Sequence, residues 1–492
     1  MARCASAADT TPVTGDVNRL NISQFQKEFL AFEREERLFD LQYSGVPFWE
    51  YLRVAIDHEL LLKKKLVSFL PCHRLPLRKK VGLLMKEIYH LFPCLLREFR
   101  SRSVACDIAL FAAESKKATV ALPFLRILSP DYRILVVDPS RLSGQKRLFA
   151  SCDVFNWRWN TMISRFWSRC FIFGKDFRQQ IRGVQKKLAA SFNVSLPLEK
   201  FVRRIFLPQY FVYCRLEGFF RRFRPRLVGV INDSRMIGVI QAAHKAKIPV
   251  FELQHGMITP LEICWAYPEG LPKVPSGIPD FFLTFGDYWN ARCELPSRKI
   301  AVGFPHFEEE RERVFRKKVS RDPRAVLVIS VMDQKLAAFL VELAKRLPDF
   351  TFYYKMRPEE FISWKEVYPE DFRRTANLIV VDSAEPSLYD LFRRVSYQIG
   401  SNSTALYEGL ALGVKTILFA GFGYQQLLDL VETCQAWLVR EPEEAVKILV
   451  QEGGSRDAPQ EESVYFKSRS DFHLRKAIKE LMSQDTCWSL AS

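Results

Sequence analysis

The sequence has no long hydrophobic run. Nowhere in its 492 residues do 18 apolar residues follow one another, whereas a membrane-spanning helix needs about 20. The N-terminus also lacks the apolar core of a secretory signal, and residues 1–20, which are small and polar, are predicted to form a disordered tail. These absences favour a cytoplasmic protein.

Paired cysteines and the common catalytic signatures are missing as well. Eleven cysteines are scattered with no Cys-x-x-Cys pair, which favours reduced thiols over a disulfide framework. The chain contains no Walker loop, no Gly-x-Gly-x-x-Gly dinucleotide signature and no Ser-His-Asp elbow. No cofactor is therefore predicted.

Positive charge is what the chain has in excess. Lysine and arginine number 73 against 56 acidic residues, a formal charge of +17 that suits a polyanion, an acidic membrane or a phosphorylated substrate. The most basic stretch, Leu60–Arg102, alternates lysines and arginines with leucines. It predicts either a helix on an anionic membrane or a helix packed on the protein with a solvated basic face.

Residues 157–224 are rich in aromatic and basic side chains and are predicted to be helical. A packed aromatic core is favoured here over nucleic-acid stacking, because the chain shows no recognised RNA- or DNA-binding motif. Nucleic acid is accordingly not among the predicted partners.

Short apolar runs alternate with helical segments in two series, which predicts parallel, doubly wound sheets. The fold class is therefore α/β, with two Rossmann-like domains facing across a cleft and an N-terminal helical extension. The predicted boundaries are a tail (1–20), a basic helical extension (21–103), an N-terminal Rossmann-like domain (104–307) with a helical insertion (about 157–224), a linker (308–323), a C-terminal Rossmann-like domain (324–451), and a loop with a terminal helix (452–492).

The most informative stretch runs from Gln398 to Phe419. It predicts a strand end, a turn rich in hydroxyl groups, a helix that ends at Gly413, and a further strand. Ser401, Asn402, Ser403 and Thr404 are all good N-cap residues. A helix that opens on free N–H groups after a strand is an anion site, although an ordinary capped helix has the same pattern.

Several short motifs, in this order, resemble the GT-B glycosyltransferases of the bacterial surface-polysaccharide group, which includes capsule sialyl- and Kdo-transferases and CDP-glycerol glycerophosphotransferases. The resemblance covers about residues 226–440. Its marks are Gln254-His255-Gly256 after a strand, Pro279-Asp280 with Phe285-Gly286, Gly303-Phe304-Pro305, Tyr354-Lys355-Met356-Arg357-Pro358, and Gly400 to Gly413. Arg357 stands where the family usually has a histidine that contacts donor phosphate or nucleotide.

The resemblance implies a donor site in the C-terminal domain. Lys355, Arg357 and the N-terminus of the 403–412 helix would neutralise the donor phosphate. Ser401, Asn402, Ser403 and Thr404 would bind the donor, the three hydroxyl groups as hydrogen-bond donors, and Glu408 would hold the ribose hydroxyls. Arginine can bind phosphate bidentately but cannot act as an acid or base. The alternatives are a surface ion pair for the two cations and a solvent-exposed helix position for Glu408. Because no Asp-x-Asp occurs, no metal site is predicted.

His255 is the predicted catalytic base, since its unperturbed pKa suits proton transfer near neutral pH. A structural histidine bonded to backbone is the alternative. Asp233 and Asp287 also follow strands and are rival bases, and Asp287 could equally cap the next helix.

Together these observations predict a metal-independent glycosyltransferase. It would move a sugar or sugar-like unit from a nucleotide-activated donor to a surface-polysaccharide or lipid-linked glycan acceptor. The basic helices would hold it peripherally at the inner face of the cytoplasmic membrane. A nucleotide-sugar epimerase and a non-catalytic nucleotide- or glycan-binding protein are the alternatives. Donor base, sugar, acceptor, stereochemical outcome and oligomeric state stay open.

Overall fold

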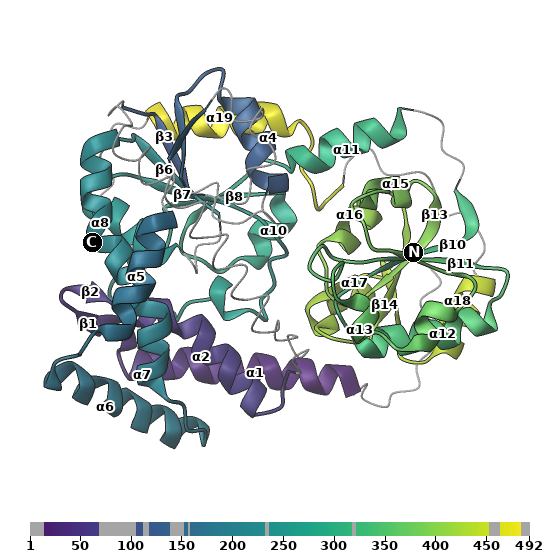
Figure 1. Cartoon of the computed structure of the whole chain (residues 1–492), viewed down its shortest axis with the longest axis horizontal. Coiled ribbons are helices and arrows are strands. Elements are labelled where there is room, and N and C mark those ends of the chain that lie inside the picture. The colour runs from purple at the N-terminus through teal and green to yellow at the C-terminus, as the bar shows by residue number, and fades with distance from the viewer. Residues whose placement is uncertain are drawn as a thin grey trace. The chain divides into compact units, whose positions relative to one another are not determined.

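The computed structural model describes residues 14–67, 105–111, 118–137, 152–155, 158–231, 236–316, 321–451 and 463–483 (Figure 1). They build two compact units, one centred on the sheet of the N-terminal half and one on the sheet of the C-terminal half. Most of the basic stretch Leu60–Arg102 lies outside the described residues. Within them, no helix is both long and apolar enough to cross a membrane.

Two helices precede the first domain, as predicted. They are α1 (Thr14–Glu35) and α2 (Trp49–Lys63), joined by a 3-10 turn (Leu38–Asp40) and a hairpin of β1 (Gln42–Tyr43) and β2 (Val46–Pro47). The hairpin turns at Ser44 and Gly45, both at positive φ. Helix α1 begins at Thr14, inside the predicted disordered tail. The threonine and Asp16 suit a first helical turn, and that signal outweighs the small, polar composition.

The first domain contains a seven-stranded parallel sheet in the order β5-β4-β3-β6-β7-β8-β9. The first six positions follow the Rossmann order 3-2-1-4-5-6, and β9 adds a seventh strand. The strands are β3 (Ile108–Phe111), β4 (Ile134–Val137), β5 (Asp153–Phe155), β6 (Leu227–Val230), β7 (Val250–Leu253), β8 (Phe281–Thr284) and β9 (Arg298–Ala301).

Side-chain alternation along these strands supplies two cores, one on each face of the sheet. Ile108 and Leu110 of β3 belong to one core, and Ala109 and Phe111 belong to the other. Helices α4 (Ala118–Leu128) and α19 (Ser470–Ser483) cover the first face, and α8 (Leu207–Phe223) and α9 (Ile237–Lys245) cover the second. The predicted terminal helix is confirmed, and it completes the core of the first domain (Figure 1).

The segment predicted to be a helical insertion is helical. It comprises α5 (Arg158–Cys170), α6 (Lys175–Phe192), α7 (Leu198–Phe201), a π-helical turn (Val202–Phe206) and α8. Phe173, Phe177 and Phe206 surround the ring of Tyr43 from the N-terminal hairpin. The core interpretation is correct for these rings. The remaining helical elements of the domain are a 3-10 turn (Ile263–Trp265), α10 (Asp287–Arg292) and α11 (Pro305–Phe315).

The charged stretch 308–323 was predicted to be a linker or a solvated helix, and its first part, up to Phe315, belongs to helix α11. Proline at the first helical position and three consecutive glutamates in the first turns favour a helix there.

The second domain contains a six-stranded parallel sheet in the order β12-β11-β10-β13-β14-β15, again the Rossmann order. Its strands are β10 (Asp322–Ile329), β11 (Thr351–Lys355), β12 (Leu378–Val381), β13 (Val395–Gly400), β14 (Lys415–Phe419) and β15 (Ala436–Val439). Its helices are α12 (Gln334–Arg346), α13 (Trp364–Val367), α14 (Glu370–Arg374), α15 (Leu388–Phe392), α16 (Ala405–Ala411), a 3-10 turn (Tyr424–Leu427), α17 (Leu428–Glu432) and α18 (Pro442–Gln451).

The two Rossmann-like parallel-sheet domains of the prediction are thus confirmed by the strand orders. Strands β5 and β15 were not predicted. Both are short edge strands without a clear turn signal on each side, so pairing with β4 and β14 defines them more than their local pattern does.

Candidate functional site

The carboxyl edge of the second sheet has a topological switch point between β10 and β13. These strands are neighbours, but the chain leaves β10 toward one side of the sheet and β13 toward the other. Loops 330–333 and 401–404 therefore lead away toward opposite faces of the sheet, and such a switch point is where open α/β sheets typically bind ligands. The predicted donor residues 401–404 lie on one of these two loops.

Ser401 follows β13 directly and is fully buried. Its hydroxyl oxygen has no hydrogen-bond partner in the part of the chain that the structure describes. Ser403 accepts a hydrogen bond from the backbone N–H of Ala405 at 3.3 Å, and Thr404 precedes α16 without a side-chain cap. Gly413 has a φ of 77°, so the predicted left-handed end of this helix is confirmed.

A glycine loop after β14 forms a further wall of this region, and the sequence interpretation missed it. A Cβ on Gly423 would lie 2.3 Å from Nδ2 of Asn402, and one on Gly421 would lie 2.5 Å from Oδ2 of Asp333. Only glycine allows the loop to approach the other two so closely. The Gly-Phe-Gly triplet after a β-rich run was the available signal.

Two buried carboxylates hold the loops in place. Asp333 accepts from the backbone N–H groups of Lys335 and Phe422, both at 2.9 Å, and so ties the β10 loop to the glycine loop. Glu360 accepts from the Ser330 hydroxyl at 2.8 Å and from the Arg357 N–H at 2.8 Å. Neither acid was singled out from the sequence, because their role depends on contacts between separate loops.

Arg357 lies at the switch point itself. Its Nε donates to the carbonyl oxygen of Ser330 at 3.0 Å, and its terminal nitrogen donates to that of Asn402 at 3.2 Å. The side chain thus bridges the two loops that separate there, and the residue is exposed. Because a guanidinium carries five N–H donors, these two bonds leave donors for a ligand.

Lys355 has a different environment from Arg357. Its ammonium group donates to the carbonyl oxygens of Ser383, Ala384 and Pro386, at 2.7, 3.3 and 2.8 Å. Partial burial lowers its pKa, which nearby acidic groups partly offset. Three donors meeting three carbonyl oxygens fix the loop after β12. The predicted phosphate contact of Lys355 stays a prediction.

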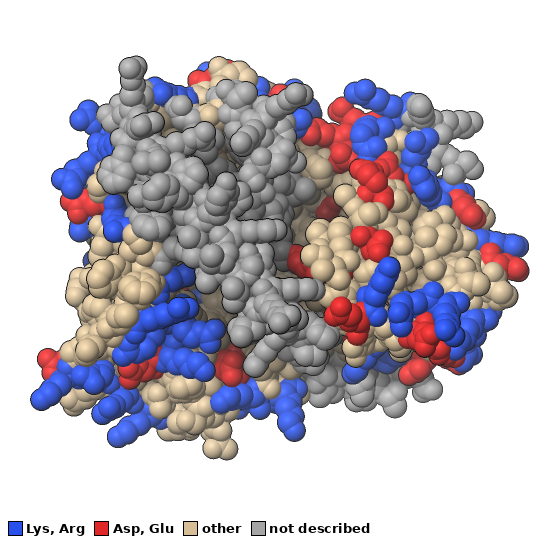
Figure 2. All heavy atoms as spheres, in the orientation of Figure 1, with Lys and Arg blue, Asp and Glu red and all other residues tan. Residues whose placement is uncertain are grey.

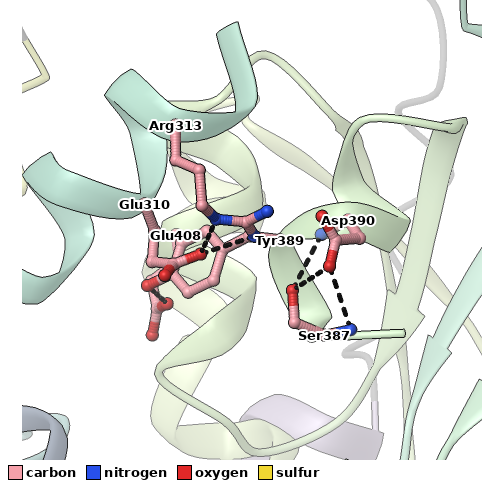
Figure 3. Close-up of polar contacts among 6 residues, drawn as sticks. All are labelled: Glu310, Arg313, Ser387, Tyr389, Asp390 and Glu408. Atoms are coloured by element: carbon pink, nitrogen blue, oxygen red, sulfur yellow. Dashed lines mark hydrogen bonds and ion pairs between the residues drawn. The ribbon is translucent and has the colours of Figure 1, made fainter. Parts of the chain in front are cut away.

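Glu408 is buried on α16, so the solvent-exposed alternative is wrong. Its carboxylate accepts a hydrogen bond from the hydroxyl of Tyr389 on α15 (Figure 3). Burial raises the pKa of Glu408 to about 7, and the Tyr389 hydroxyl offsets part of that effect. A capping box of Ser387 and Asp390 fixes the start of α15 and with it the position of Tyr389. The ribose contact stays a prediction.

This pKa shift predicts a pH-dependent stability. The native state holds a proton on Glu408 up to about pH 7, whereas the unfolded chain releases it near pH 4.5, so stability falls as pH rises between these values. In Glu408→Gln the decline should be shallower by up to about 1.4 kcal/mol per pH unit, the value of one proton. Tyr389→Phe should extend the decline to higher pH, because losing the hydroxyl raises the native pKa of Glu408 further. Denaturant titrations at pH 5, 6 and 7 measure both, and equal slopes in all three proteins would contradict the assignment.

In the first domain, His255 follows β7 and is held by its neighbour Gln254. The side chain of this buried glutamine accepts from the Phe285 N–H at 2.7 Å and donates to the Gly256 carbonyl at 2.8 Å. The His255 ring is 23% exposed, and its Nδ1 lies 3.9 Å from a carboxylate oxygen of the fully buried Glu252. A carboxylate at that position favours the charged imidazolium that forms when the ring takes up a proton.

Of the two rival bases, the structure describes Asp287 but not Asp233. Asp287 is exposed in the first turn of α10, where its carboxylate accepts a hydrogen bond from Asn290 at 3.2 Å. Gly286, and not Asp287, is the N-cap of that helix. Asp233 lies outside the described residues. His255 and Asp287 follow neighbouring strands, so the sheet brings them to the same edge.

An open, shallow hollow lies at that edge of the first sheet. Its walls are mainly apolar and include Leu253, Phe285 and Phe304, with Gln254 as a polar group. The rings of Phe285 and Phe304 stack with their centroids 4.2 Å apart. Across the described ranges, no cluster of three or more His, Cys, Asp or Glu side chains could hold a metal ion.

No protein-family model matches the chain, and no curated protein sequence matches it. Among solved structures, the chain is similar to a UDP-GlcNAc 2-epimerase from Methanocaldococcus jannaschii in complex with UDP-GlcNAc and UDP. The identity is 11%, the TM-score 0.48, and the match covers 76% of this chain and 99% of the other.

Two further solved structures match the chain with similar identity, TM-score and coverage. A UDP-GlcNAc 2-epimerase from Neisseria meningitidis bound to UDP-GlcNAc has 14% identity, a TM-score of 0.45 and coverages of 78% and 100%. The glycosyltransferase of kitacinnamycin has 12% identity, a TM-score of 0.43 and coverages of 77% and 95%. Similarities of this size do not say what this chain binds.

Proposed function

We propose that the second domain binds a nucleotide-activated sugar at the switch point of its sheet, and that the protein is a GT-B glycosyltransferase. The observation that carries the proposal is the arrangement around Arg357. An exposed guanidinium bridges loops 330–333 and 401–404, next to the buried Ser401 hydroxyl, which has no hydrogen-bond partner among the described residues. Donors that converge at a Rossmann switch point suit a nucleotide phosphate.

The proposed reaction needs two kinds of group. Arg357 neutralises the charge that grows on the phosphate of the leaving nucleotide, and the hydroxyl groups of Ser401, Ser403 and Thr404 donate hydrogen bonds to it. His255 takes the proton of the acceptor hydroxyl as the new glycosidic bond forms and the bond from sugar to phosphate breaks. The nearby carboxylate of Glu252 stabilises the resulting imidazolium.

The acceptor in this proposal is a surface-polysaccharide or lipid-linked glycan, and the protein is cytoplasmic and associates peripherally with the membrane. The apolar hollow at the carboxyl edge of the first sheet and the +17 charge support these parts. The capsular type rests on the sequence motifs alone.

A thermal-shift panel of CMP, CDP, UDP, GDP and their sugars tests the proposal. Because a ligand that binds only the native state raises the melting temperature, one nucleotide series should stabilise the protein. Turnover should then require an added acceptor. Conversion of the bound donor without an acceptor would indicate an epimerase, and binding without turnover on any acceptor would indicate a non-catalytic binding protein. No shift with any nucleotide would overturn the proposal.

The hydroxyl groups at the switch point give a sharper expectation. Ser403→Ala combined with Thr404→Ala should weaken nucleotide binding by roughly 1–3 kcal/mol, the range for hydrogen bonds to charged groups. Ser396→Ala with Thr433→Ala is the matched control, since both hydroxyls in that pair bond backbone carbonyls elsewhere in the domain. Calorimetry on the folded variants measures the difference. If the two double variants bind nucleotide with equal affinity, residues 403 and 404 do not belong to the nucleotide site.

A further inference from the structure

Helix α5 in the first domain inverts the usual arrangement of a surface helix. Its small polar residues Ser164 and Ser168 are buried. Its large apolar residues Phe166 and Trp167 are 62% and 57% exposed. A helix on a water-facing surface normally does the opposite, because exposing aromatic rings forfeits the hydrophobic free energy of burying them.

The apolar exposure continues beyond the helix and rests on a firm base. Ile172, just after α5, is 80% exposed. On each side of it, Phe171 and Phe173 pack their rings against Tyr43, and Arg203 donates to the Phe171 carbonyl at 2.6 Å. The exposed side chains are therefore presented by an ordered support, which favours a surface built for contact.

Positive charge surrounds these apolar side chains. Arg165, Arg169 and Lys175 are all exposed. Residues 163–192, which span most of α5 and all of α6, carry seven basic residues and one acidic residue. Figure 2 shows Lys and Arg atoms gathered beside uncharged atoms on the face of this domain that carries α5 and α6.

We infer that Phe166, Trp167 and Ile172, with Arg165, Arg169 and Lys175, form a docking surface for an anionic membrane. This α5 surface combines aromatic groups that enter the lipid interface with cations that attract acidic headgroups, without a spanning segment. The inference rests on the proposed function in one respect: a lipid-linked acceptor would be met at such a surface. The surface is separate in sequence from the basic stretch Leu60–Arg102.

Other occupants fit the observations less well. A second copy of this chain, meeting through the same surface, would bring two sets of these cations together, and like charges repel. An acidic protein would satisfy the charge but gives no particular reason for a phenylalanine and a tryptophan side by side. A lipid interface accounts for both features.

Sedimentation of the full chain with vesicles tests the inference. One set of vesicles is phosphatidylcholine alone, and the other also contains phosphatidylglycerol. Wild type should sediment with the anionic set and dissociate as salt is raised, because salt screens the attraction. Phe166→Ser with Trp167→Ser, and separately Arg165→Glu with Arg169→Glu, should each lower the partition coefficient by roughly tenfold or more.

Matched controls carry the same changes elsewhere. Ile362→Ser with Phe472→Ser removes two other exposed apolar side chains, and Arg373→Glu with Lys447→Glu reverses two other exposed cations. Both control pairs should bind like wild type. Binding of the α5 variants at wild-type strength, equal binding to both vesicle types, or no binding of wild type at all would overturn the inference. The nucleotide thermal shift of the same proteins reports separately on the proposed function.

Discussion

Replacing His255 with alanine should lower the turnover rate by roughly 10²–10⁴-fold and leave nucleotide affinity nearly unchanged. The expectation follows from its position. The ring lies at the carboxyl edge of the first sheet, it is partly exposed, and a buried carboxylate lies 3.9 Å from Nδ1. Such a group suits proton transfer from an acceptor hydroxyl. Nucleotide affinity should be unaffected, because the proposed donor site lies in the second domain.

His244 is the matched control for this experiment. It lies in the same domain, but its ring nitrogens contact the Ser276 carbonyl at 2.9 Å and the Asp280 carboxylate at 3.2 Å. His244→Ala should therefore lower the melting temperature while the folded fraction keeps its activity. If His255→Ala behaves in the same way, His255 is structural. If it weakens nucleotide binding instead, it is a phosphate ligand, and unchanged turnover would direct the search to Asp233 or Asp287.

Replacing Arg357 with glutamine should raise the nucleotide Kd by about 10- to 100-fold, the effect of losing a charged hydrogen bond of roughly 1.5–3 kcal/mol. Arg357→Lys should recover only part of the loss, since lysine keeps the charge but not the planar pair of donors. The measurement is calorimetry with the nucleotide identified by the thermal-shift panel.

Lys355, two residues away, provides the contrast. Its three donors meet backbone carbonyls of loop 383–386, so Lys355→Met should lower the melting temperature of the nucleotide-free protein. Its effect on affinity should be smaller than that of Arg357→Gln. The reverse order of effects would mean that Lys355 leaves those carbonyls to bind phosphate, as the sequence motif predicts. Equal Kd values for wild type and Arg357→Gln would contradict the assignment of Arg357.

Local sequence patterns were sufficient to predict most of the strands and the loops at their ends. Buried parallel strands are near-continuous apolar runs, as in the Ile-Leu-Val-Val of β4, and polar residues mark where each run stops. The hydroxyl-rich loop 401–404, Arg357 and His255 were all identified in this way. Edge strands β5 and β15 were not, because their pairing with a neighbour is a non-local interaction.

The environment of each site residue could be determined only from the three-dimensional structure. The sequence could not separate a buried Glu408 from an exposed one, because Tyr389 lies on another helix. The roles of Asp333, Glu360 and the Gly421–Gly423 turn likewise depend on loops that meet only in the folded sheet. The same holds for the inverted helix α5, which packs against α8, a helix well separated from it in the chain.

The sequence alone determined that this protein has two Rossmann-like domains, because hydrophobic periodicity and strand-end polar residues are local properties. Only the tertiary structure decided that the terminal helix α19 completes the core of the first domain, where Leu474 and Ile478 pack with Phe124. It also decided that Arg357 bridges two loops while Lys355 fixes a third. The physical reason is the same in each case: burial and hydrogen bonding depend on which distant segments the fold brings together.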